Sequence, residues 1–303
     1  MLHSSYLEPL DSTDANPSSK LLNHPDVVIK NPKSVLSKVK QILKDGAIAL
    51  HIITDFDMTL TKHWVNGQRN FSSHSVLAAS KAVSESFINS EKALCAEYYP
   101  IEISTTISFE EKYAKMVEWW ERCHSYYIEE KLTKDYICDV AHKFDMPYRE
   151  GAHELIDVTA EKQIPVLVFS AGIGDIIEEL LRSQKLLQPH VHVVSNSMSF
   201  DDEAPHYCNG FKRPLIHVLN KGEVALKETP FYNLAAGRGN AILMGDSLGD
   251  IQMAGGLDHK TLLTVGFLNY DVEKLLPSYM EKFDVVITND ASFDWVHSIL
   301  NQL

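Results

Sequence analysis

Short apolar runs that alternate with helical stretches fill the second half of the sequence and constrain its fold most. They are rich in β-branched residues, and segments with helical spacing, such as DIIEELLRSQ, separate them. Continuous apolar strands of this kind are typical of a parallel sheet covered by helices on both faces. We therefore predict an α/β protein with a Rossmann-like parallel sheet. Its strands are expected in AIALHII (from residue 47), IPVLVFSAG, VHVVSNSM, NAILMGDSLGD, TLLTVGFL and DVVITND.

The stretch between the first predicted strand and the others is helical in character. SHSVLAASKAVSESFINSEKAL and SFEEKYAKMVEWWERCHSYYIEEKL have apolar residues at helical spacing, and we expect no strand in this region. We predict a helical cap domain over residues 63–163, inserted into a catalytic core made of residues 31–62 and 164–303. Residues 1–30, rich in Ser, Asp, Asn and Pro, are expected to form a loose tail. The next stretch, NPKSVLSKVKQILKDG, is expected to form a short amphipathic helix.

The overall charge limits the partners of the chain. Its 303 residues carry a formal net charge of −13, which argues against nucleic acid or an anionic membrane as a partner. The four cysteines are scattered without a Cys-x-x-Cys pair, which suits a reducing cytosol. No stretch approaches the roughly 20 apolar residues of a membrane span, and the N-terminus lacks a signal-type apolar core. We expect a cytoplasmic monomer that acts on a small molecule.

The first predicted strand ends in a pair of carboxylates, Asp55 and Asp57. Side chains at i and i+2 point to the same side of a strand, so we expect these carboxylates to lie close together. Such charges repel each other and are costly to bury, and either a bound cation or a catalytic role would resolve the conflict. A solvated turn is the simpler alternative. A calcium loop is excluded because Leu60 stands where that loop requires Gly.

A later strand also ends in polar groups. FSAGIGD places Ser170 at a strand end, with Gly172 and Gly174 in the turn that follows. Glycine lets the backbone approach a ligand, and the unpaired N–H groups at the start of the next helix can bind a phosphate. The alternative is a glycine-rich turn without a ligand. A dinucleotide fingerprint is not supported, because Ile177 stands where Gly or Ala is expected.

The motif MGDSLGD ends another strand with Asp246, and Asp250 follows in the next turn. If a helix begins here, Asp250 lies one turn above Asp246. Alone, such a turn is more often structural than catalytic. Lys212, Lys221 and Lys227 lie between this motif and the preceding one, and composition cannot choose among them.

Taken together, these motifs resemble those of the haloacid dehalogenase-like phosphohydrolases, in which Asp-x-Asp-x-Thr, Ser, Lys and Gly-Asp-x-x-x-Asp follow successive strands. From about residue 33 to the C-terminus the sequence also resembles the cytosolic 5′-nucleotidase III family. That family contains pyrimidine 5′-nucleotidases and a branch that prefers 7-methylguanosine monophosphate. The resemblance is carried by DFDMTLT, YYPIE, KMVEWWERCH, VFSAGIGDIIEELLR, GFKRPLIHVLNK and MGDSLGDIQMAGG.

The resemblance implies a Mg²⁺-dependent 5′-nucleotidase that hydrolyses nucleoside 5′-monophosphates, CMP and UMP or 7-methyl-GMP, to nucleoside and phosphate. Asp55 would be the nucleophile that forms an aspartyl-phosphate. Asp57 would protonate the leaving oxygen and then help to activate water. The family pattern assigns Mg²⁺ to the Asp55 carboxylate, the Asp57 backbone carbonyl and the Asp246 carboxylate, with Asp250 in a supporting role.

The same resemblance implies which residues hold the substrate. Ser170, the N–H of Ala171 and Lys221 would bind the phosphate. Within the cap, the substrate-binding positions would be Glu102 in YYPIE, Trp120 and Cys123.

Some residues depart from the family pattern or allow another interpretation. Cys123 stands where pyrimidine-preferring members have Ser, and His63 with Trp64 replaces an aromatic-plus-small pair. Trp120 also fits the apolar stripe of its helix, so packing within the cap is its alternative role. The competing functions are a phosphatase for another small ester, such as phosphoserine, and a non-catalytic binding protein with the same fold.

Overall fold

The main sheet of the protein has the predicted parallel character. The structure is a computed structural model that describes residues 21–104, 106–223 and 226–303. Within those residues the strand order is β1-β11-β10-β9-β2-β5-β6, and all neighbours are parallel except β1 and β11. The strands are β1 (Val27–Ile29), β2 (Leu50–Thr54), β5 (Val166–Ile173), β6 (Val191–Asn196), β9 (Asn240–Gly245), β10 (Thr261–Leu268) and β11 (Val285–Thr288).

The edge strand β1 corrects part of the prediction for the N-terminal region. Residues 27–29 fall within the expected loose tail, but they pair antiparallel with β11, with Val27 opposite Ile287. This short VVI run has high β propensity, and the backbone of β11 at the edge of the sheet gives it a pairing partner. Residues 1–20 lie outside the described residues.

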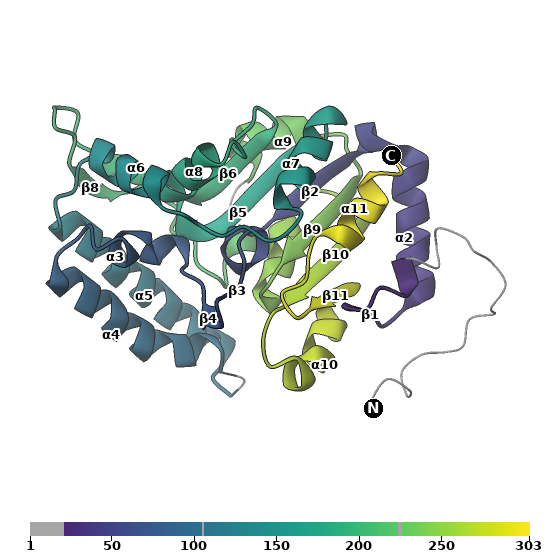
Figure 1. Cartoon of the computed structure of the whole chain (residues 1–303), viewed down its shortest axis with the longest axis horizontal. Coiled ribbons are helices and arrows are strands. Elements are labelled where there is room, and N and C mark those ends of the chain that lie inside the picture. The colour runs from purple at the N-terminus through teal and green to yellow at the C-terminus, as the bar shows by residue number, and fades with distance from the viewer. Residues whose placement is uncertain (1–20, 105, 224–225) are drawn as a thin grey trace.

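Both faces of the sheet are buried, as the continuous apolar runs predicted. Successive residues point to opposite faces, so Ile52 and Ile53 of β2 belong to separate apolar clusters. Helices cover both faces (Figure 1), and every described helix is too short or too polar to cross a lipid bilayer. The helices around the sheet are α2 (Pro32–Asp45), α7 (Ala152–Glu161), α8 (Gly174–Ser183), α9 (Pro230–Ala235), α10 (Val272–Lys282) and α11 (Asp294–Leu300).

The predicted amphipathic helix is α2. The Asn31 side chain accepts a hydrogen bond from the Ser34 N–H at its start, and Pro32 occupies the first turn. Gly46 ends the helix with a positive φ of 76°. Its buried face is formed by Val35, Val39 and Ile42.

The region between β2 and β5 is mainly helical, as expected, but two details of the prediction are wrong. A small hairpin of β3 (Trp64–Val65) and β4 (Gln68–Arg69) occurs where no strand was expected. In addition, the stretch over 73–94 that was expected to be helical is interrupted between α3 and α4, where Lys81 adopts a positive φ of 54°. The helices are α3 (Val76–Ala79), α4 (Glu85–Glu102), α5 (Phe109–Glu129) and α6 (Lys134–Lys143), of which α4 and α5 lie side by side, away from the main sheet (Figure 1).

The chain leaves the core and returns to it along adjacent segments. The Lys62 N–H donates to the Pro147 carbonyl at 3.0 Å, and the Arg149 N–H donates to the Leu60 carbonyl at 2.8 Å. Helix α7 then packs beside α11. This pairing favours a return to the core near residue 149, earlier than the predicted boundary at 163. A further hairpin of β7 (Met198–Phe200) and β8 (Cys208–Phe211) contacts α5.

Candidate active site

Asp55 and Asp57 follow the end of β2, and Asp57 is near enough that its charge adds to the rise that burial causes in the pKa of Asp55. Strand β2 ends at Thr54, and residues 56–60 form an irregular turn in which Met58 has a positive φ of 61°. The i, i+2 rule therefore no longer applies to the two acids. The Asp57 carboxylate accepts hydrogen bonds from the Ser73 backbone N–H and hydroxyl, each at 2.7 Å.

The partners of Asp55 come from the neighbouring strand β9. The Asp55 N–H donates to the Met244 carbonyl at 2.9 Å, which brings the ends of β2 and β9 together. Asp246 follows β9 directly, and Asp250 lies in the 3₁₀ turn 248–254. A side chain at Gly245 would place its Cβ 2.4 Å from the Asp250 Cβ, so this position requires glycine for the turn to fold back.

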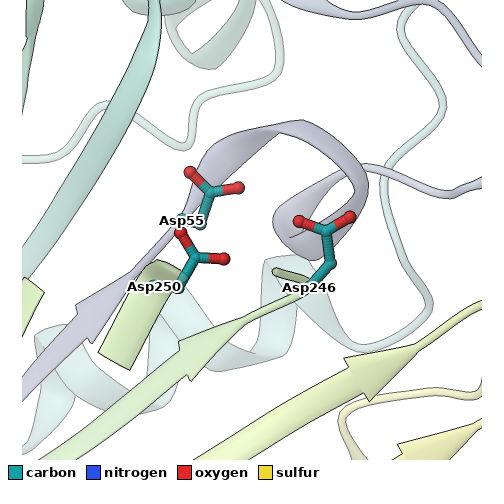
Figure 2. A group of neighbouring side chains, drawn as sticks. All are labelled: Asp55, Asp246 and Asp250. Atoms are coloured by element: carbon teal, nitrogen blue, oxygen red, sulfur yellow. The ribbon is translucent and has the colours of Figure 1, made fainter. Parts of the chain in front are cut away.

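These three acids form one cluster (Figure 2). Carboxylate oxygens of Asp55, Asp246 and Asp250 lie within 4.8 Å of one another. Lys221 binds the cluster from a buried position, with its Nζ 2.5 Å from Asp55 Oδ1 and 2.7 Å from Asp250 Oδ1. The other oxygen of Asp250 accepts a hydrogen bond from the Ser247 N–H at 2.8 Å. Of the three candidate lysines, Lys221 is therefore the one at the acidic cluster.

Burial makes this cluster electrostatically unfavourable without further positive charge. It raises the pKa of Asp55 and of Asp246, and the carboxylates of Asp250 and Asp55 add to the rise at Asp246. Burial alone would lower the pKa of the Lys221 ammonium, but the Asp250 and Asp55 carboxylates outweigh it and raise this pKa. Converging carboxylate oxygens are the ligands that a hard divalent cation such as Mg²⁺ prefers. The donor set therefore fits such an ion.

The predicted phosphate-binding residues lie on the neighbouring strand β5. Ser170 is buried, and its Oγ accepts a hydrogen bond from the Gly172 N–H at 3.0 Å. β5 runs on to Ile173, past the predicted strand end at Ser170, with a register shift relative to β6. A Cβ at Gly172 would lie 2.0 Å from the Ser73 Oγ, so glycine at this position allows the residue that binds Asp57 to approach.

Trp120 and Asn196 both donate hydrogen bonds to the backbone carbonyl of Ala171. The Trp120 indole N–H donates to it at 2.7 Å from helix α5, and the Asn196 side chain donates at 2.8 Å from β6. Trp120 is only 7% exposed and makes an edge contact with His74. The cap is thus hydrogen-bonded directly to the strand segment that carries Ser170.

Glu102 is the last residue of helix α4, which belongs to the predicted cap. Burial raises the pKa of its carboxyl to about 7, while the positive charges of Arg69 and Lys112 oppose the rise. Lys112 donates to the Glu102 backbone carbonyl at 3.0 Å, and Arg69 lies over the ring of Tyr99, 4.8 Å from its centroid. Glu102 is therefore a carboxyl whose charge changes near neutral pH.

Cys123 lies in helix α5, one turn beyond Trp120. Burial raises the pKa of its thiol to about 12, so it remains protonated and is a poor nucleophile at neutral pH. The departures His63 and Trp64 lie where the chain leaves the core, and the backbone N–H groups of both donate to the Asp290 carboxylate at 3.0 Å.

Sequence reasoning missed several residues of the site. Ser73, Asn196 and Arg149 contact its loops, yet none stands in a motif with chemical meaning. Only the serine-rich stretch FSSHS hinted at hydroxyl donors near the start of the cap.

The parallel sheet with its inserted helices has the haloacid dehalogenase-like fold, and the acidic cluster lies at the ends of its strands. A family model described as "Pyrimidine 5'-nucleotidase (UMPH-1)" matches residues 58–303. The chain belongs to that family and is a phosphoric monoester hydrolase of the 5′-nucleotidase type. This confirms the fold class, the resemblance and the enzyme class predicted from the sequence.

Relatives that are named for their activity agree with this assignment. The chain is 38% identical over 278 residues to the 7-methylguanosine phosphate-specific 5′-nucleotidase of Gallus gallus, which covers 91% of this chain and 96% of that protein. It is 37% identical to the Homo sapiens protein of the same name, in an alignment that covers 91% of this chain and 92% of that protein. The crystal structure of cytosolic 5′-nucleotidase IIIB bound to cytidine matches with a TM-score of 0.86 at 31% identity, covering 93% of this chain and 94% of that one.

Proposed function

We propose that the protein is a Mg²⁺-dependent nucleotidase that hydrolyses CMP, UMP or 7-methyl-GMP to nucleoside and phosphate through an aspartyl-phosphate. The observation that carries this proposal is the Lys221–Asp55 contact of 2.5 Å beside the carboxylates of Asp246 and Asp250. A carboxylate in this position, held by a buried cation, is suited to attack phosphorus and form a covalent intermediate.

The roles of the acids follow from their surroundings. Burial raises the pKa of Asp57, although the Ser73 hydrogen bonds oppose the rise, and this favours a protonated acid that can donate to the leaving oxygen. Once ionised, Asp57 can accept a proton from the water that hydrolyses the aspartyl-phosphate. A Mg²⁺ held by Asp55, Asp246 and the Asp57 carbonyl, with Asp250 beside it, would neutralise the carboxylates and the phosphate.

The phosphate and the base would be bound at different ends of the site. Ser170, the Ala171 N–H and Lys221 are proposed to hold the phosphate, because β5 and the acidic cluster lie next to each other in the sheet. Glu102, Trp120 and Cys123 are proposed to contact the nucleoside from the cap. An ionised Glu102 would give a charge-assisted hydrogen bond to a donor on the base, such as an exocyclic amino group.

The test is phosphate release from CMP, UMP, 7-methyl-GMP, GMP, AMP and phosphoserine, with Mg²⁺ or with EDTA. We expect release from CMP and 7-methyl-GMP only with Mg²⁺, poor release from GMP and AMP, and none from phosphoserine. Asp55→Asn should stop turnover while the protein stays folded, because an amide cannot form the phosphoenzyme. Faster release from phosphoserine than from any nucleotide would favour the alternative function, and full activity of Asp55→Asn would refute the nucleophile.

We also propose that the protein acts in the cytoplasm, as a monomer, on small nucleotides and without nucleic acid or membrane partners. The net charge of −13 supports the absence of anionic macromolecular partners. The name of the cytosolic 5′-nucleotidase matched in structure supports the location. Sedimentation of the purified protein tests the monomer.

A further inference from the structure

Arg149 occupies the point where the chain returns from the cap to the core. Its backbone N–H pairs with Leu60 in the outgoing segment, and its side chain is 1% exposed. A guanidinium so deeply buried is costly unless its donors are satisfied and its charge is paired. The groups that satisfy it therefore indicate what it does.

Two of those groups are backbone carbonyls of the turn that follows Asp57. Arg149 Nη2 donates to the Met58 carbonyl at 2.6 Å, and its Nε donates to the Thr59 carbonyl at 2.7 Å. Met58 is the residue with the left-handed conformation, which is unfavourable for a side chain other than glycine. Arg149 thus stabilises the strained part of the turn that carries Asp57.

Arg149 also connects this turn to the first residues of the cap. Its Nη1 lies 3.1 Å from Asp290 Oδ1, and the Asp290 carboxylate accepts the backbone N–H groups of His63 and Trp64. Asn269 completes the arrangement, since its amide donates to the Met58 carbonyl at 3.0 Å and accepts from Arg149 at 3.1 Å. One buried ion pair therefore contacts both the catalytic turn and the outgoing segment.

We infer that Arg149, with Asp290 and Asn269, is a positioning residue that fixes the Asp57 turn relative to the cap. The inference rests on the proposed role of Asp57 as the acid. Arg149 reaches the turn through backbone carbonyls, and its hydrogen bonds go to none of the residues proposed to bind the substrate. Its loss should therefore affect the rate of the chemical step and leave substrate binding nearly unchanged. A misplacement of about 1 Å in a catalytic group can cost on the order of a hundredfold in rate.

Arg238 provides a matched control within the same sheet. It also donates to several backbone carbonyls, including those of Ala47 at 2.9 Å and Leu50 at 2.8 Å, but at the opposite end of β2. Loss of Arg238 should lower stability without changing the active site. A comparison of the two arginines separates positioning from general stabilisation.

The experiment measures kcat, KM and the unfolding temperature of Arg149→Ala, Arg149→Lys and Arg238→Ala at a temperature where each is folded. Nucleoside monophosphates and p-nitrophenyl phosphate both serve as substrates. We expect Arg149→Ala to lose about tenfold to a hundredfold in kcat with KM within about twofold of wild type. Arg149→Lys should retain an intermediate kcat, and Arg238→Ala should keep the wild-type kcat. Added guanidinium, but not NaCl at equal ionic strength, should restore part of the Arg149→Ala rate.

A wild-type kcat in Arg149→Ala, or an equal kcat loss in Arg238→Ala, would overturn the inference. So would a failure of Arg149→Lys to fold, since Arg149 would then belong to the fold alone. If p-nitrophenyl phosphate is hydrolysed as expected but no nucleotide is, the proposed substrate is wrong and the positioning role stands. If wild type hydrolyses neither, both proposals fail.

Discussion

Ser73 donates two hydrogen bonds to the carboxylate of Asp57, one from its backbone N–H and one from its hydroxyl, each 2.7 Å long. Asp57 belongs to the turn after β2, whereas Ser73 belongs to the segment that begins the cap. The position of the cap is therefore coupled to the proton affinity of the proposed acid. This contact leads to the first prediction.

Ser73→Ala should shift the alkaline limb of the pH profile of kcat/KM upward. Both Ser73 bonds lower the pKa of Asp57 against the rise caused by burial, so losing the hydroxyl lets this pKa rise further. A hydrogen bond to a charged group contributes about 1.5 to 3 kcal/mol, which corresponds to roughly 1 to 2 pH units. Asp57 would then keep its proton at higher pH. Ser72→Ala is the control in the same segment, and an unchanged alkaline limb in Ser73→Ala would contradict the role of Asp57.

Lys221→Met should destabilise the metal-free protein and raise KM for all nucleotides alike. The substitution leaves the buried carboxylates of Asp55 and Asp250 without their cation, which costs about 3 to 5 kcal/mol for a buried pair. Mg²⁺ should recover part of this loss, so it should raise the unfolding temperature more in the variant than in wild type. Thermal unfolding with EDTA or Mg²⁺ checks this, with the exposed Lys227→Met as the control. A change in KM that depends on the base would contradict a phosphate-binding lysine.

Substrate affinity should weaken as the pH falls through 7 because of Glu102. Burial raises the pKa of this carboxyl from 4.5 to about 7, so its charged form is present above pH 7 and is lost as the pH falls through that value. The KM for CMP and 7-methyl-GMP should therefore rise, by up to about tenfold per pH unit below the pKa. Glu102→Gln should have a high KM at pH 8 and lose this dependence. p-Nitrophenyl phosphate, which has no base, reports the other titrating groups, and an identical KM rise for it would exclude Glu102 as the cause.

Substitutions of Trp120 should separate its anchoring role from base recognition. Trp120→Phe keeps an aromatic ring but removes the donor to the Ala171 carbonyl, so turnover of CMP and 7-methyl-GMP should fall alike. Trp120→Ala should add a further loss on 7-methyl-GMP, because a cationic base over an indole gains about 0.5 to 2 kcal/mol. The measurement is the ratio of kcat/KM for the two nucleotides. An unchanged ratio in Trp120→Ala would make Trp120 a packing residue only.

The parts of the site that depend on the sheet could be predicted from the sequence, because buried parallel strands are continuous apolar runs that can be recognised in it. The apolar runs located the ends of β2 and β9, which Asp55 and Asp246 follow, whereas the pairing of these two strands is a finding of the structure. The contact of the Asp57 carboxylate with Ser73 could not be predicted, since β2 ends at Thr54 and an irregular turn follows it. The i, i+2 rule holds only inside a strand.

Side-chain contacts to backbone carbonyls produce no such pattern in the sequence. Arg149 is separated by 90 residues from the Thr59 carbonyl and by 142 from that of Ala291. Any residue type can supply a carbonyl, so no pattern around Met58 or Ala291 indicates an arginine partner. The short strands β3 and β4 were missed for a related reason, because each consists of only two residues.

The chain leaves the core at residues 60–62 and returns at residues 147–149, and these two segments are hydrogen-bonded to each other. The cap is therefore inserted into the core at a single point. The Lys62 N–H and the Pro147 carbonyl already lie 3.0 Å apart, a spacing that a tight hairpin turn could close. The length and sequence between them can therefore change without moving β2 relative to β5. Within this architecture, one hydrolytic core can be combined with caps of different shape, provided that the contacts of Ser73 and Trp120 with the core are kept.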